Sequence, residues 1–226
     1  MNFSKKSLGQ NFLNDQNVIK KIVNLTEIRN RNIIEIGPGK GALTKEILSK
    51  KPSSLTLIEK DFFLAGELKK EFSKNKSIRI YNEDILKFDF DKISKLDYKI
   101  FGNLPYNISS QILVKIVKLN RLSIKLKDVV FMFQKELGEK IISKFPSKKY
   151  GRISILTNFK FKVLKKFLIS SNCFIPKPKV DSMIIHFKPI TINRYQIKNL
   201  NNLEKVTNIL FSNKRKMINK NIKKIL

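Results

Sequence analysis

Apolar positions along the chain follow two alternating periodicities. Longer segments with apolar side chains three or four positions apart predict helices, and short continuous apolar runs predict buried strands. The two kinds take turns over most of the chain, which is typical of a parallel sheet with helices on both faces. The pattern predicts helices over 14–25, 42–49, 63–72, 110–119 and 135–143, and strands over 32–37, 54–60, 77–84, 98–104 and 128–134.

The pattern changes after Pro146. It predicts a helix over 152–158, a strand over 160–168, a proline-broken loop with the sequence FIPKPK, and a strand over 182–187. The two strands are consistent with an antiparallel hairpin at the edge of the sheet. Pro189 marks the predicted end of the main domain, so we expect an α/β core over 1–189 and a helical segment over 190–226.

Composition narrows the class of protein. A chain of 226 residues with 42% hydrophobic residues can bury one α/β domain with a small appendage. It contains neither an apolar run near the ~18 residues of a membrane span nor the apolar core of a signal peptide, so we expect a cytoplasmic protein without membrane contact. With one cysteine, Cys173, and one histidine, His186, we expect no internal disulfide and no metal site.

The charge balance favours an anionic partner. The chain has 47 Lys and Arg against 18 Asp and Glu, a formal net charge of +29, and such a field attracts nucleic acid. A lysine-rich codon bias would produce the same excess, so charge alone does not decide. Within the basic C-terminal segment, we predict phosphate contacts from Lys214, Arg215 and Lys216, the alternative being an exposed lysine-rich helix.

Chemistry-bearing residues follow successive predicted strands. The sequence EIGPGKG at 35–41 places Gly37 at the end of the first strand, where open α/β sheets bind ligands. Glu59 ends the second strand, where a carboxylate can accept both hydroxyls of a ribose, and Asp84 ends the third, where it can accept from an adenine amine. A ribose-binding acid also suits NAD, but the pyrophosphate fingerprint is missing, so an adenosyl group such as that of S-adenosylmethionine fits better.

The sequence Asn103-Leu104-Pro105-Tyr106 ends the fourth strand. An adenine amine is a poor nucleophile because its lone pair is delocalised into the ring. Hydrogen bonds from the amine to the Asn103 side-chain oxygen and the Leu104 carbonyl would favour tetrahedral nitrogen. Pro105 would fix the turn that points this carbonyl inward, and Tyr106 could stack on the base.

These motifs together resemble the ribosomal RNA adenine N6,N6-dimethyltransferases of the KsgA type. The resemblance spans nearly the whole chain and is carried by LGQNFLND, EIGPGKGALT, IEKD, NED, FGNLPYNIS, YGR and FIPKPKVDS, in the family's order. It implies a Rossmann-like class I methyltransferase fold, S-adenosylmethionine as cofactor, and a role in ribosome biogenesis. The implied substrate is a pair of adjacent adenosines in the 3′-terminal hairpin of small-subunit (16S) RNA, within the immature 30S subunit.

The resemblance also implies roles for single residues. Tyr106 and Phe174 would enclose the target adenine between them, and the segment LGQNFL would form a lid over the cofactor. The implied cofactor contacts are Asn11, Leu13, Gly37, Glu59, Asp84 and Asn103. The family usually carries a longer C-terminal helical domain, so we expect several of its helices to be missing. We expect a monomer.

Two other readings remain open. A sister family with the same fold methylates large-subunit RNA and confers antibiotic resistance, although NLPY and PKPKVDS favour the small-subunit family. A ribosome-assembly factor could keep the fold without catalysis, but such a protein would have no reason to retain Glu59, Asp84 and NLPY.

Overall fold

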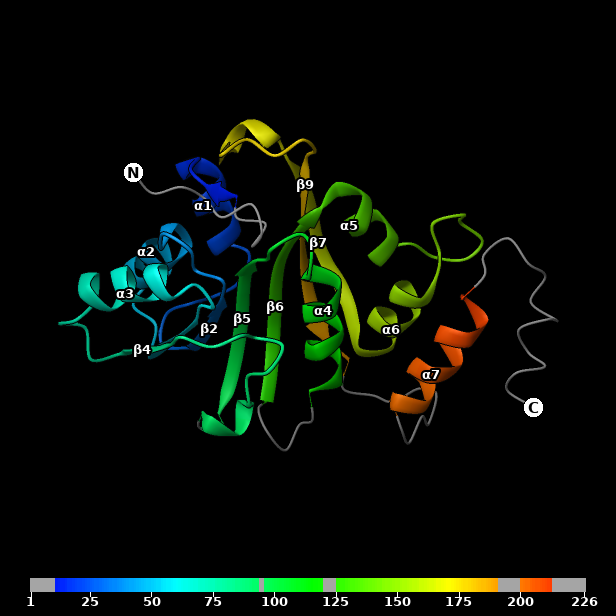
Figure 1. Cartoon of the computed structure of the whole chain (residues 1–226), viewed down its shortest axis with the longest axis horizontal. Helices are drawn as coiled ribbons and strands as arrows, with labels where there is room; N and C mark the ends of the chain where they lie inside the picture. Colours follow the sequence, from blue (N-terminus) through cyan, green and yellow to red (C-terminus); the bar gives the residue numbers. More distant parts are fainter. Residues whose placement is uncertain (1–10, 94–95, 120–124, 191–199, 213–226) are drawn as a thin grey trace.

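A mixed seven-stranded sheet forms the centre of the molecule in this computed structural model (Figure 1). The strands lie in the order β4-β3-β2-β5-β6-β9-β7. The first five are parallel, and β9 runs antiparallel to both of its neighbours. The structure describes residues 11–93, 96–119, 125–190 and 200–212. The sheet strands are β2 (Asn32–Ile36), β3 (Ser54–Ile58), β4 (Ile78–Tyr81), β5 (Asp97–Asn103), β6 (Lys125–Gln134), β7 (Phe161–Ile169) and β9 (Ser182–Pro189).

Helices cover both faces of this sheet, as the apolar pattern predicts. Alternate residues of a strand point to opposite faces, so Ile33 of β2 joins the core beneath α1, α2 and α3, and Ile34 joins the core beneath α4 and α5. Ile47 of α2 and Ile116 of α4 are fully buried on these two sides. The helices are α1 (Gln16–Val23), α2 (Ala42–Ser49), α3 (Phe62–Glu71), α4 (Ser109–Lys118), α5 (Lys135–Ile141), α6 (Arg152–Lys160) and α7 (Leu200–Leu210).

The strand order reverses at β2. The chain runs outward from β2 through β3 to β4, and then returns to place β5 on the other side of β2. The loops that follow β2 and β5 therefore diverge to opposite faces. In open α/β sheets this divergence leaves a crevice at the carboxyl ends of the strands, which is where ligands bind.

The third predicted strand is shorter than expected. We predicted a strand over 77–84, but β4 ends at Tyr81. The Asn82 side chain donates hydrogen bonds to the carbonyls of Glu59, at 3.0 Å, and Lys60, at 3.2 Å. These side-chain bonds take the place of further strand pairing beyond the end of β3, and Asp84 lies in the turn that follows.

The predicted antiparallel pair of strands is confirmed, with β7 as the edge strand and β9 between β7 and β6. Lysines at positions 162, 165 and 166 line the edge strand. Charged side chains on an edge strand oppose pairing with another chain.

A two-stranded ribbon was not predicted. Strand β1 (Phe12–Leu13) pairs antiparallel with β8 (Phe174–Ile175), so that Leu13 lies opposite Phe174. The Asn14 amide adds a 2.8 Å hydrogen bond to the Cys173 carbonyl. Strands of two residues have no periodicity to detect, and their partners are far apart in the sequence. The predicted lid segment is thereby joined, at its described end, to the FIPKPK loop.

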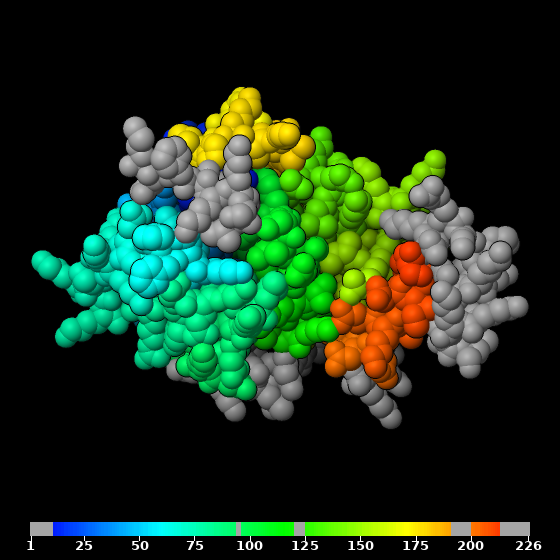
Figure 2. Space-filling view, viewed as in Figure 1, coloured from blue at the N-terminus to red at the C-terminus, as the bar shows by residue number. Residues whose placement is uncertain are grey.

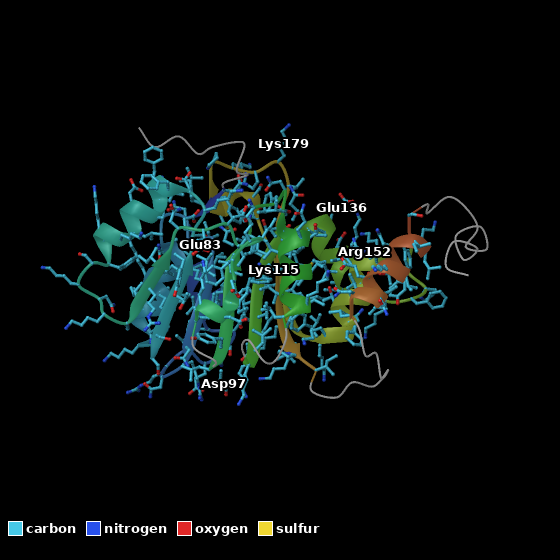
Figure 3. All side chains as sticks on the ribbon, turned by 60° about the horizontal axis from the view of Figure 1, so that its bottom comes forward. Glu83, Asp97, Lys115, Glu136, Arg152 and Lys179 are labelled. Carbon is cyan, nitrogen blue, oxygen red and sulfur yellow. The ribbon has the colours of Figure 1, made fainter. Side chains whose placement is uncertain are left out.

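Helix α7 packs beside α6 at the end of the molecule remote from β4, as Figures 1 and 2 show in orange. The Glu204 carboxylate on α7 binds Arg152 of α6 at 2.5 Å and Lys118 of α4. Figure 3 shows Arg152 beside α7.

The predicted domain boundary falls at the end of β9 and stays a prediction. Lys214, Arg215 and Lys216 lie outside the described residues.

Candidate active site

One cavity at the carboxyl ends of β2, β3 and β5 collects most of the residues singled out in the sequence. Its walls come from the glycine loop after β2, the ends of β3 and β5, the turn after β4, and the β1 segment. The predicted site residues that line it are Asn11, Leu13, Gly37, Glu59, Asp84, Asn103, Leu104, Pro105 and Tyr106. Residues that the sequence places far apart are therefore neighbours in one cavity.

The glycine loop brings main chain to the cavity wall. Gly37 and Gly39 have φ angles of +66° and +58°, which glycine adopts without strain. A Cβ atom at Gly39 would lie 3.0 Å from the Phe12 ring, so a side chain there would require the ring to shift. The loop therefore depends on glycine at position 39 for both its conformation and its contact with the β1 segment.

Glu59 is held by main-chain donors at the end of β3. Its Oε2 accepts from the Gly39 amide at 3.1 Å, and its Oε1 accepts from the Asp61 amide at 2.9 Å. The side chain is 7% exposed, and this burial raises its pKa although the amide hydrogen bonds act in the opposite direction. The carboxylate is thus oriented in advance, and a carboxylate has about four acceptor positions, more than these bonds occupy.

Glu35 is a second buried carboxyl on the cavity wall, and the sequence assigned it no role. Its Oε2 accepts a 2.7 Å hydrogen bond from the Thr44 hydroxyl of α2. Burial raises the pKa of Glu35 to about 8; the Thr44 bond lowers it in part, and the nearby charge of Glu59 raises it further. Glu35 is therefore mostly protonated at neutral pH.

Asp84 lines the cavity with a partner of its own. Its Oδ2 lies 2.8 Å from Lys60 Nζ, and its Oδ1 accepts from the Leu86 amide at 2.9 Å. The Lys60 hydrogen bond, which is the largest cause, lowers the pKa of Asp84, so the carboxylate is ionised. The sequence reasoning missed Lys60, although the motif IEKD contains it.

The loop after β5 faces the same cavity. Asn103 Nδ2 donates a 3.0 Å hydrogen bond to the Asn11 carbonyl, which fixes the side-chain amide and ties the loop to the segment before β1. Leu104 is 1% exposed and closes the core beneath the loop. The Ile108 amide donates to the Pro105 carbonyl at 3.2 Å, and this bond forms the turn into α4.

Tyr106 is held at both ends. Its hydroxyl lies 2.6 Å from Ser182 Oγ at the start of β9, and its carbonyl accepts from Ser109 Oγ at 3.2 Å. Burial raises the pKa of the Tyr106 phenol, while the Ser182 hydrogen bond lowers it in part. The two most specific motifs, NLPY and PKPKVDS, thus meet at one hydrogen bond. The sequence shows Ser182 only as the last residue of its motif.

The structure does not bring Phe174 to the cavity wall. The Phe174 side chain is 2% exposed and packs in the core on the α1 side of the sheet, in the same cluster as Leu13 and Ile169. Its predicted contact with a target base stays a prediction. In the described arrangement, Tyr106 alone of the pair lines the cavity.

The cavity has the features of an adenosyl site. Apolar side chains of Ile58 and Ile85 line it together with Glu59, so a flat ring and a sugar diol would each meet suitable groups. Within the described residues, no cluster of three or more His, Cys, Asp or Glu side chains could hold a metal ion. No helix of the described part is long and apolar enough to span a membrane.

Comparisons with known proteins place the chain in a family. The family model described as ribosomal RNA adenine dimethylase matches residues 1–226. The ribosomal RNA small subunit methyltransferase A of Pelagibacter ubique is 47% identical over 217 residues, covering 96% of this chain and 82% of the relative.

Solved structures show the same fold. A dimethyladenosine transferase from Plasmodium falciparum superposes with a TM-score of 0.79 at 28% identity, over 94% of this chain and 74% of that one. The 23S rRNA methyltransferase ErmE superposes with a TM-score of 0.73 at 24% identity, over 95% of this chain and 84% of that one. The fold is therefore that of a class I methyltransferase, and the chain belongs to the ribosomal RNA adenine dimethylase family.

Proposed function

We propose that the protein uses S-adenosylmethionine to dimethylate N6 of two adjacent adenosines in the 3′-terminal hairpin of small-subunit ribosomal RNA. One observation carries the proposal: a buried strand-end carboxylate, Glu59, and the NLPY loop line the same cavity. A site for an adenosyl donor and a site for an adenine acceptor therefore adjoin. The name of the Pelagibacter relative supports the small-subunit substrate.

The chain's own residues supply binding and orientation. When bound, S-adenosylmethionine supplies an electrophilic methyl group. We assign Glu59 to the ribose hydroxyls, with Asn11, Leu13, Gly37 and Asp84 as further cofactor contacts. Asp84 already pairs with Lys60, so its carboxylate would have to bind both Lys60 and an adenine amine.

Asn103 and Leu104 would act on the target amine. The Asn103 Nδ2 group is already used by the Asn11 carbonyl, so its Oδ1 is oriented to accept from the amine. The Leu104 carbonyl would accept the second N–H. A monomethylated amine keeps one N–H, so it can bind again for the second transfer. Tyr106 would stack on the base, and Phe174 would cover its other face if the FIPKPK loop presents it.

The segment after β9 is the proposed accessory part. We propose a methyltransferase core over 1–189 and a basic segment over 190–226, in which Lys214, Arg215 and Lys216 contact RNA phosphates. We further propose the immature 30S subunit as the RNA-bearing partner and the cytoplasm as the compartment.

Methyl transfer to purified subunits tests this function. Protein, labelled S-adenosylmethionine and under-methylated small subunits are incubated, and the RNA is digested to nucleosides. We expect label in N6,N6-dimethyladenosine, with large subunits as the matched control remaining unlabelled. Label in the large subunit would favour the antibiotic-resistance type of enzyme. Subunit binding without any label would favour a non-catalytic assembly factor.

A further inference from the structure

We propose that Ser182 is a positioning residue that holds the Tyr106 ring where the target adenine stacks. The inference rests on the proposed function, because it assigns a task to Ser182 within the same site. The NLPY loop accounts for Tyr106, but nothing in the function so far uses the serine at the end of the PKPKVDS motif.

The Ser182 hydroxyl is a fixed point. Ser182 is 0% exposed and lies in the first position of β9, paired with Gln134 of β6 on one side and Ile169 of β7 on the other. The preceding residue is also anchored. The Asp181 carbonyl accepts from the Lys135 amide at 2.9 Å, and its carboxylate accepts from the Ser171 amide at 3.0 Å.

Tyr106, in contrast, lies in a loop and is only half-buried. The 2.6 Å contact between the Tyr106 hydroxyl and Ser182 Oγ fixes the far end of the ring. The bond from Ser109 Oγ fixes the near end by holding the Tyr106 carbonyl. A ring that is already held loses less freedom when a base stacks on it, so the anchor favours substrate binding.

Burial strengthens this bond. Hydrogen bonds in a low-dielectric interior are stronger than those in water, and an unpaired buried hydroxyl is costly. Either hydroxyl can donate, so the pair forms one bond that is lost when either partner is changed. Removing Ser182 Oγ and removing Tyr106 Oη should therefore have the same consequence.

A double-variant cycle tests the proposal. Ser182→Ala and Tyr106→Phe should each reduce kcat/KM for under-methylated small subunits about 2- to 12-fold, mainly by raising KM, because one net hydrogen bond is lost. The double variant should lose no more than the single variants. Affinity for S-adenosylmethionine should stay within about twofold of wild type, since neither hydroxyl is among the proposed cofactor contacts.

The matched control is Ser143→Ala. Ser143 is also a buried serine, but its hydroxyl has no hydrogen-bond partner among the described residues, so kcat/KM should not change. Wild-type kcat/KM in Ser182→Ala, or losses that multiply in the double variant, would overturn the proposal. If Ser182→Ala fails to fold, Tyr106→Phe decides alone, and full activity in that variant would count against the anchor.

A second measurement does not depend on catalysis. The chain has 5 tyrosines, so ring signals in ¹³C-tyrosine-labelled protein can be assigned to Tyr106 by its phenylalanine variant. We expect Ser182→Ala to broaden or split the Tyr106 ring signals, whereas Ser143→Ala leaves them unchanged. Unaltered Tyr106 signals in Ser182→Ala would overturn the proposed role of Ser182, whether or not the wild-type protein methylates RNA. Failure of the wild-type protein to methylate RNA would contradict only the proposed function.

Discussion

The Thr44 hydroxyl donates a 2.7 Å hydrogen bond to Oε2 of Glu35; both side chains are buried, and Glu35 lines the cavity. Burial raises the pKa of Glu35 to about 8, so the folded protein binds a proton that the unfolded chain releases above its ordinary pKa of 4.5. The stabilisation that comes from binding this proton is fully present below the pKa of Glu35 in the unfolded chain, 4.5. It is lost as the pH rises through the pKa in the folded protein, about 8.

Glu35→Gln replaces the protonated acid by a neutral group of the same shape. Between about pH 5 and about pH 9, we expect the melting temperature of the variant to fall less than that of wild type. Calorimetry of the two proteins in matched buffers measures the difference. Glu71→Gln, at an exposed position on α3, is the control and should follow wild type. If the melting temperatures of wild type and Glu35→Gln changed in parallel with pH, Glu35 would be ionised in the folded protein.

Glu59→Ala should weaken cofactor binding. Hydrogen bonds to a charged group are worth ~1.5–3 kcal/mol, or about 10- to 150-fold in affinity, which titration calorimetry with S-adenosylmethionine measures. Ala would also leave the Gly39 and Asp61 amides without their acceptor. We therefore expect a lower melting temperature as well.

The control for this variant is Glu46→Ala on α2, an acid that does not line the cavity. It should bind cofactor as wild type does. Unchanged affinity in Glu59→Ala would remove the assignment of Glu59 to the ribose.

Asp128 of β6 should stabilise the protein at neutral pH and lose this effect in acid. Burial tends to raise its pKa, but the 2.9 Å bond to His186 and the charge of Lys99 more than offset this and lower the pKa to about 2. The contribution is present above the ordinary value of 3.8 and is lost as the pH falls through about 2.

Asp128→Asn should cost ~1.5–3 kcal/mol of unfolding free energy at neutral pH, because it removes hydrogen bonds to a charged group. Urea unfolding at about pH 7 and about pH 3 measures the difference in unfolding free energy between the variant and wild type. This difference should be smaller at the acid pH. Asp97→Asn changes an exposed acid of β5 and serves as the control. A gap of the same size at both values would show that the charge of Asp128 contributes nothing.

RNA affinity should depend on salt through the basic C-terminal residues. Replacing Lys214, Arg215 and Lys216 by alanine should flatten the slope of log affinity against log salt by about 2–3 units if all three neutralise phosphates, at ~0.7–0.9 per contact. Filter binding at several salt concentrations gives the slope. Replacing Lys70, Lys74 and Lys76, at the end of α3 and in the loop before β4, removes the same number of positive charges and controls for net charge. An unaltered slope would mean that the three residues form a solvated surface.

The sequence predicted the parts of the site that depend on local order. The strands over 32–36 and 54–58 are short and rich in Ile and Leu, so the sequence places Gly37 and Glu59 at their carboxyl ends. Parallel pairing then brings such ends to one edge of the sheet, which is why Asn103 joins them.

Contacts between distant segments could not be predicted in this way. The β1–β8 ribbon joins residues 12–13 to residues 174–175, and the bond between Tyr106 and Ser182 depends on the insertion of β9 between β6 and β7. Local periodicity contains no information on either pairing. The burial of Phe174 follows from the same ribbon, because the pairing with Leu13 directs the ring into the core.

Asn103 and Tyr106 should fail in different ways when they are changed. Asn103→Ala removes the acceptor that would hold the target amine, and it also releases the loop from the Asn11 carbonyl. Loss of such a preoriented polar contact typically costs about 10²–10³ in turnover. Tyr106→Ala removes stacking worth ~1–3 kcal/mol per base, and this loss should appear mainly in KM for the RNA.

Steady-state kinetics on under-methylated small subunits separates the two effects, because kcat and KM are obtained from the same experiment. Asn32→Ala is the matched control, since Asn32 likewise donates its side-chain amide to a carbonyl, that of Asp97, but does so at the first position of β2, the opposite end of that strand from the cavity. It should keep the wild-type kcat. The affinity of Asn103→Ala for S-adenosylmethionine shows how much of the lost activity comes from weaker binding of the methyl donor. An Asn103→Ala protein with wild-type turnover, or a Tyr106→Ala protein with wild-type KM, would show that the NLPY loop does not hold the target base.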